Sequence, residues 1–154
     1  PALFGVAWAG EEVSLNWFDV AREYTEKWHH QQQIRDAVGT PALYSRKWLH
    51  PVLDAFVRAL PVNYKNTLAA SGTQLSFVIT GEAGGVWTLV RRIDDWQLFV
   101  GVADKVVCRI EFNQDTAWRL MTKGLARDEA AKRIEIIGEK KFAEPLLGTL
   151  AVMA

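Results

Sequence analysis

The 154-residue sequence has little cysteine, no net charge and no long apolar run. Its single cysteine, Cys108, has no partner for an intrachain disulfide, so we expect a reducing, cytoplasmic location. Eighteen basic residues balance eighteen acidic ones, with no block of like charge. Because nucleic acids and membrane surfaces attract clustered positive charge, neither is expected as a partner. No apolar run approaches the ~20 residues of a membrane-spanning helix, and no signal-peptide pattern is visible.

Hydrophobic residues make up 49% of the chain, as is typical of a globular protein. Cys108 stands in the apolar run Val106–Ile110, where we expect it to pack as a small hydrophobic side chain. The sequence begins with proline and not methionine. We therefore expect it to be processed or to be part of a longer protein.

Helix signals dominate the first 61 residues. Residues 16–38 are expected to form a helix that is capped at its first residue and ended by Gly39. Thr40-Pro41 is expected to start a second helical stretch. Pro51 should kink that stretch or make it start afresh at His50, and Pro61 should end it, because proline lacks a backbone N–H.

The pattern changes after residue 73. Four apolar runs separated by turn residues predict the strands of an antiparallel meander, at 74–80, 86–92, 96–102 and 105–112. The glycine-rich segment 81–85 lacks the Lys-Ser/Thr of a phosphate loop and is expected to be a hairpin turn. Later patterns predict helices at 116–124 and 126–133, a short strand at 134–138 and a closing helix at 139–154. We therefore predict an α+β fold, with a helical segment at 1–62 and a sheet-containing domain at 73–154.

Two of the three histidines lie within the first predicted helix. Glu26 and His30 are four residues apart, so their side-chain tips can converge on one divalent ion, and His29 is the alternative partner. His50 is a candidate third ligand. The same spacing also suits an ordinary pair on a helix surface, and spacing does not decide between the two.

The segment "WFDVAREYTEKWHHQQQIRDAVG", together with "AWAGEE" before it, resembles the last helix of DinB-like four-helix bundles. The resemblance is to the branch that contains mycothiol-dependent maleylpyruvate isomerase. It implies that Glu26 and His30 are metal ligands, with zinc as the expected ion and a thiol such as mycothiol as a cofactor. The early-helix histidine of that family has no counterpart in this sequence.

The second half supports the same resemblance. "DTAWRLMTKGL" followed by "IEIIGEKKFAEPLL" resembles the C-terminal domain of these isomerases, which is similar to sterol carrier proteins. The family's pattern more often has aspartate where this chain has Glu139. The likeness covers nearly the whole chain but only the later part of the family's proteins. It also implies a functional arginine, for which Arg119, Arg127 and Arg133 are candidates beside their ordinary role in helix packing.

Two functions follow as expectations. The first is a metal-dependent isomerase or thiol transferase, in which the metal lowers the pKa of the thiol and an arginine holds a substrate carboxylate. The second is a non-catalytic module that binds an apolar ligand between sheet and helices, where several of the seven tryptophans are expected to pack. In that second case a homodimer through the N-terminal helices is a further possibility.

Overall fold

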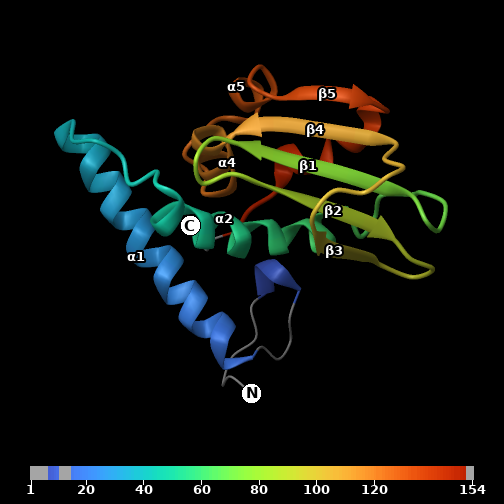
Figure 1. The fold of residues 1–154 in the computed structure, drawn as a ribbon, viewed down its shortest axis with the longest axis horizontal. Helices are drawn as coiled ribbons and strands as arrows, with labels where there is room; N and C mark the ends of the chain where they lie inside the picture. The colour runs from blue at the N-terminus through green and yellow to red at the C-terminus, as the bar shows by residue number, and fades with distance from the viewer. Residues whose placement is uncertain (1–6, 11–14, 152–154) are drawn as a thin grey trace.

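A computed structural model describes residues 7–10 and 15–151 (Figure 1). It confirms the α+β class: helices precede a five-stranded sheet of order β3-β2-β1-β4-β5. Most of the expected irregular lead-in, 1–13, and the last three residues of the predicted closing helix lie outside the described residues. A short 3₁₀ turn, η1 (Ala7–Ala9), is the first element.

Helix α1 (Asn16–Val38) confirms the first helix prediction. Gly39 ends it in the left-handed conformation, with φ of 69°, as glycine does without a steric penalty. The N-cap is Leu15, so Asn16 is the first helical residue and not the cap. Helix α1 packs against α2 and extends beyond one end of the sheet (Figure 1).

The second helical stretch begins later than predicted. Residues 40–44 are non-helical, and α2 (Arg46–Phe56) follows the N-cap Ser45. Two side chains of α1 bind the backbone of this connection: Gln32 Oε1 accepts from the Leu43 N–H at 2.9 Å, and Trp28 Nε1 donates to the Leu43 carbonyl at 3.2 Å. These bonds satisfy backbone groups that a helix would otherwise use.

A kink at Pro51 stays a prediction, whereas a fresh start at His50 and an end of the helix at Pro61 are wrong. Pro51 lies inside α2, which continues to Phe56. The 3₁₀ turn η2 (Val57–Ala59) then leads into α3 (Leu60–Tyr64), where Pro61 stands in the first turn and does not end the helix. Proline fits there because the first helical N–H groups have no intrahelical acceptor.

Three strands form two consecutive hairpins, β1 (Gln74–Thr80), β2 (Gly85–Arg91) and β3 (Trp96–Val100). Their pairing is antiparallel, so the glycine-rich turn at 81–84 connects a hairpin as predicted. Alternate side chains such as Phe77, Trp87 and Leu89 point towards the helices, following the period-two pattern of a strand.

The fourth strand corrects the predicted antiparallel meander. β4 (Cys108–Asn113) pairs parallel with β1 and antiparallel with β5 (Glu135–Gly138). The chain therefore leaves the end of β3 and crosses to the far side of β1 before β4 begins (Figure 1). The result is a mixed sheet with β3 and β5 at its edges.

Helix α4 (Gln114–Met121) starts directly after β4, and Asn113 caps it by accepting from the Thr116 N–H at 2.8 Å. Helix α5 (Arg127–Ala131) is shorter than predicted. The predicted closing helix is not formed in its described part. Two 3₁₀ turns, η3 (Lys140–Phe142) and η4 (Pro145–Gly148), take its place, with Pro145 starting the second.

One hydrophobic core lies between the sheet and the helices. Cys108 is fully buried in it, as expected for a packing role. The core draws on both predicted segments, with Trp28, Leu49, Phe56, Phe77, Trp87, Trp118 and Leu146 among its members. In the part of the chain that the structure describes, no helix has both the length and the apolar character needed to cross a membrane.

Candidate functional site

The structure places Glu26 and His30 on the solvent side of α1. His30 Nε2 lies 3.7 Å from Glu26 Oε2, and the two side chains are 69% and 38% exposed. The other ring nitrogen of His30 lies 3.1 Å from Gln33 Oε1. Among residues 7–10 and 15–151 no group of three or more His, Cys, Asp or Glu side chains is arranged to hold a metal ion. Zinc binding by Glu26 and His30 stays a prediction.

The other two histidines have separate surroundings. His29 is buried and its ring contacts Trp118, with 5.9 Å between centroids. Burial, and next the charge of His30, lower its pKa. His50 Nδ1 lies 2.8 Å from the Ala83 carbonyl oxygen, so this nitrogen carries the proton and donates it. His50 thus secures the β1–β2 turn.

Two of the three candidate arginines meet at one carboxylate. Arg119 Nε lies 2.8 Å from Asp115 Oδ1, and Arg133 Nη1 lies 3.9 Å from Asp115 Oδ2. Arg127 instead pairs with Glu144 near the molecular surface. The prediction that Arg119 and Arg133 are functional residues therefore concerns one cluster, which comes from α4 and the turn after α5.

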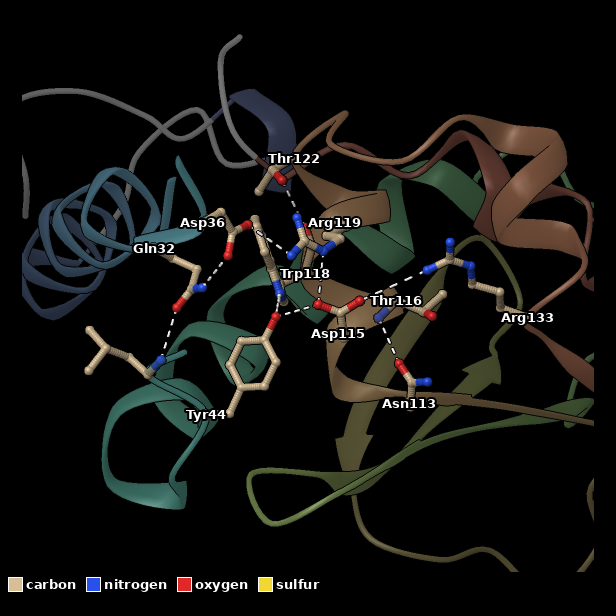
Figure 2. Close-up of polar contacts among 11 residues, drawn as sticks. Gln32, Asp36, Tyr44, Asn113, Asp115, Thr116, Trp118, Arg119, Thr122 and Arg133 are labelled. Atoms are coloured by element: carbon tan, nitrogen blue, oxygen red, sulfur yellow. Dashed lines mark hydrogen bonds and ion pairs between the residues drawn. The ribbon is translucent and has the colours of Figure 1, made fainter. Parts of the chain in front are cut away.

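Asp115 is the centre of a polar network that reaches α1 (Figure 2). The Tyr44 hydroxyl donates to Asp115 and accepts from Trp118 Nε1 at 2.8 Å. Arg119 also binds Asp36 at the end of α1, with 2.8 Å between Nη2 and Oδ2. The guanidinium of Arg119 lies over the Trp118 ring, 4.3 Å from its centroid, which is a cation–π contact.

The network sets the protonation of its members. Burial disfavours the charged form of Asp115, but hydrogen bonds from Tyr44 and Arg119 outweigh it and hold the pKa below its ordinary value. Burial, and then the hydrogen bond to Asp115, raise the pKa of Tyr44 to about 12. For Arg119, burial opposes the charge, but hydrogen bonds to Asp115 and Asp36 raise its pKa. At neutral pH Tyr44 is therefore neutral, Asp115 is a carboxylate and Arg119 is charged.

This arrangement binds elements together and leaves little for an outside molecule. Arg119 is committed to two carboxylates of the protein, and Asp115 accepts from two side chains. The geometry therefore favours a structural role for the network, in which it fixes the end of α1 and the 39–45 connection to α4.

A separate pocket opens between the helices and the edge of the sheet. It has a volume of about 210 Å³ and is more enclosed than two larger, more open hollows of about 550 Å³ and 340 Å³ near residues 92–97 and 120–127. Its walls come from α2, η2, α3, β2 and β3, with Asp54, Arg58, Pro61, Trp87, Leu98 and Val100 among the lining residues. Val100 continues the inward-facing series of β3, yet it is 80% exposed, because the helices do not cover the end of this strand.

A charged pair lies at this pocket. Asp54 Oδ1 accepts from Trp87 Nε1 at 3.0 Å, and Asp54 Oδ2 lies 3.6 Å from Arg58 Nη2. The Arg58 guanidinium is held over the ring of Trp17, 4.6 Å from its centroid. Both charged side chains are more than a third exposed. The pocket thus exposes more polar than apolar surface, and one cation and one anion lie at its wall beside the side chains of Trp87, Leu98 and Val100.

The sequence predicted an apolar-ligand site between sheet and helices, but not its position or the residues that line it. The spacing of Asp54 and Arg58 is an ordinary helical pair, and nothing in it indicates that β3 lies opposite. The one available signal was Val100, an apolar residue at an inward-facing position near the end of a predicted strand.

No family model matches the chain, and no curated protein sequence matches it either. The resemblance to the isomerases therefore stays a prediction. Solved structures do show likeness at low identity. Sterol carrier protein 2-like 2 from Aedes aegypti is 15% identical, with a TM-score of 0.43, over 55% of this chain and 80% of that one. Sterol carrier protein 2 from Yarrowia lipolytica is 14% identical, with a TM-score of 0.41, over 86% and 85%. The sec-alkylsulfatase Pisa1 from Pseudomonas sp. is 18% identical, with a TM-score of 0.41, but only 13% of its chain is covered.

Proposed function

We propose that this chain is a binding module for a small apolar molecule, held in the pocket between α2, η2, α3 and the β2–β3 edge of the sheet. The observation that carries the proposal is the exposed inner face of β3. Leu98 and Val100 belong to the face that elsewhere forms the core, yet here they line an open cavity with Trp87 beneath. A ligand in this cavity would remove apolar surface from water, which is the main driving force of such binding.

The size of the pocket limits the ligand. A water molecule occupies about 30 Å³ of liquid, so 210 Å³ corresponds to roughly seven water-sized groups. This is smaller than the pockets of drug-sized ligands, which begin near ~300 Å³. Each buried CH₂ contributes about 0.8 kcal/mol, against a substantial cost of association. We therefore expect a neutral ligand of this size to bind with a dissociation constant on the order of 1 mM.

Titration of the ¹⁵N-labelled chain with 1-hexanol, followed by NMR, tests the proposal. Trp87 is a useful reporter because it is one of the lining residues and its indole N–H donates to Asp54, another of them. We expect saturable shifts of that signal and of the Leu98 and Val100 amides. Absence of any shift, or shifts spread evenly over the surface, would contradict the proposal.

A matched pair of variants shows whether the shifts come from the pocket. Val100→Trp should fill the mouth of the cavity and abolish the response. Ile137→Trp adds the same bulk to an exposed site, 53% accessible, on the opposite edge strand β5, and should leave the response intact. Equal loss in both variants, or in neither, would argue against this binding site.

The isomerase or thiol-transferase reading stays a second expectation. Zinc and a thiol cofactor belong to that reading, and a homodimer through the N-terminal helices was expected for the binding module. Ligand binding in the pocket does not depend on any of the three.

A further inference from the structure

Arg58 has hydrogen-bonding capacity that the protein does not use. A guanidinium carries five N–H donors in a fixed, planar fork. Within the described residues, its one ion pair is to Asp54 at 3.6 Å, which is too long for a hydrogen bond, and its buried Nε has no partner. The large majority of buried side-chain polar atoms in folded proteins have at least one hydrogen-bond partner.

The position of this guanidinium is nevertheless fixed. The rings of Trp17 and Phe18 lie beneath it, with centroids 4.6 Å and 5.8 Å from Cζ. Arg58 itself comes from η2, which is packed into the core between α2 and α3. Among the described residues the cation is therefore held mainly by stacking, since the carboxylate of its ion pair lies beyond hydrogen-bond distance, and its donors remain available to an acceptor.

Asp54 does not compete strongly for those donors. Its Oδ1 atom is bound by the indole N–H of Trp87, which orients the carboxylate along the wall of the pocket. Only the other oxygen faces Arg58, at a distance beyond hydrogen bonding. A guanidinium binds best an acceptor with two oxygens close together, and Asp54 presents only one oxygen to Arg58.

We infer that the ligand is a short apolar carboxylic acid, bound with its hydrocarbon or aromatic part against Trp87, Leu98 and Val100 and its carboxylate on Arg58. This inference rests on the proposed function and adds the chemical class. The volume of about 210 Å³ restricts the apolar part to roughly seven water-sized groups, so a short chain or a single ring fits and a long-chain lipid does not.

Binding of hexanoate and of its uncharged counterpart hexanamide, measured by NMR titration at pH 7, tests the inference. The two probes have the same chain, and only the acid presents an anion to Arg58. We expect the native chain to bind hexanoate about tenfold more tightly, a preference of about 1.4 kcal/mol. In Arg58→Gln that preference should disappear, because affinity for hexanoate falls while hexanamide still binds.

Two further variants show whether the preference for hexanoate needs the guanidinium of Arg58 or only a positive charge nearby. Arg58→Lys keeps the cation but loses the fork and should retain only part of the preference. Arg92→Gln removes an exposed cation in the β2–β3 turn and should keep the full preference. Backbone NMR spectra of each variant establish that the fold is intact before affinities are compared.

The outcomes distinguish the inference from the proposed function. If hexanoate and hexanamide bind equally, or if Arg58→Gln leaves the preference unchanged, the carboxylate assignment is wrong and the apolar pocket stands. If neither probe nor 1-hexanol perturbs Trp87, both are wrong.

Discussion

The guanidinium of Arg119 lies 2.8 Å from the carboxylate of Asp36, and this ion pair ties the last turn of α1 to α4. Arg119 binds Asp115 at the same distance on its other side. Since α1 extends beyond the sheet, these contacts near its C-terminal end matter more for its position than a surface pair would (Figures 1 and 2). Both ion pairs are about one-third exposed, so solvent reduces their strength without removing it.

Replacing Arg119 with alanine is expected to lower the free energy of unfolding by about 1–2 kcal/mol, because two carboxylates lose a charged partner. Hydrogen exchange of the amides in the second half of α1 should accelerate more than exchange in β1. Arg127→Ala is the control: the Arg127–Glu144 pair is more than half exposed and its loss should cost about 0–0.5 kcal/mol. Similar losses in both variants would show that the Arg119 network has no special role.

Tyr44→Phe is expected to destabilise the chain by about 1–2 kcal/mol, because it removes one hydroxyl that makes two hydrogen bonds. The indole N–H of Trp118 then loses its acceptor. Tyr24→Phe is the matched control, since the Tyr24 hydroxyl makes a single exposed bond to the Trp48 carbonyl. Urea unfolding of the two variants gives the comparison, and a larger loss for the Tyr24 variant would contradict this account.

Tyr44 also predicts behaviour at high pH. Its pKa is raised to about 12 from an ordinary value near 10, so the folded state keeps the proton longer than the unfolded state. Stability should therefore fall as the pH rises from about 10 towards 12. Thermal melts at pH 9 and pH 11 measure this fall, and it should be smaller in Tyr44→Phe. If Tyr44→Phe loses as much stability between pH 9 and pH 11 as the native chain does, the loss comes from groups other than Tyr44.

The sequence predicted correctly those elements that are determined by residues close together in the chain. Gly39 ends α1 because the left-handed conformation there is favourable only without a Cβ, and this signal is visible in one residue. The strands at 74–80 and 86–92 were likewise predicted from their own residues, and the short glycine-rich turn between them favours antiparallel pairing in a hairpin. Pro51 lies inside α2, which begins four residues before His50, so a proline by itself did not give the helix boundary.

Long-range relationships were not predictable in the same way. Nothing in residues 105–112 indicates that this strand pairs in parallel with β1, because the periodicity of a strand gives its faces and not its neighbour. The cluster of Arg119 and Arg133 at Asp115 depends on how α5 folds back on α4. The Arg58 pocket depends on β3 ending beyond the cover of the helices.

Gly84→Ala is expected to destabilise the β1–β2 turn by about 1–3 kcal/mol. An added Cβ would lie 2.0 Å from the Ile79 carbonyl oxygen, a clash with backbone that no side-chain movement relieves. Gly148→Ala is the control, because an added Cβ there meets nothing within 4 Å. It should be neutral or slightly stabilising, since alanine restricts the unfolded chain. Thermal unfolding compares the two, and equal stability would contradict the close approach at Gly84.

His29 is expected to make stability depend on pH in the mildly acidic range. Its pKa is lowered mainly by burial, so the folded state binds fewer protons than the unfolded state, whose histidine titrates near ~6.5. Stability should then decrease as the pH falls below about 6.5 and continue to decrease until the lowered pKa is reached. The charged neighbours act in opposite directions, since His30 lowers this pKa and Glu26 raises it.

Melting temperatures of the native chain and of His29→Gln between pH 7.5 and pH 5 test this dependence. The variant removes the titrating group, so its melting temperature should change less with pH, even if it is lower throughout. His30→Gln replaces the neighbouring histidine, whose side chain is 69% exposed, and should keep most of the native slope. If the melting temperature of His29→Gln depends on pH as steeply as that of the native chain, acid destabilisation comes from other groups. Removal of a buried imidazole that resists protonation must otherwise flatten this dependence.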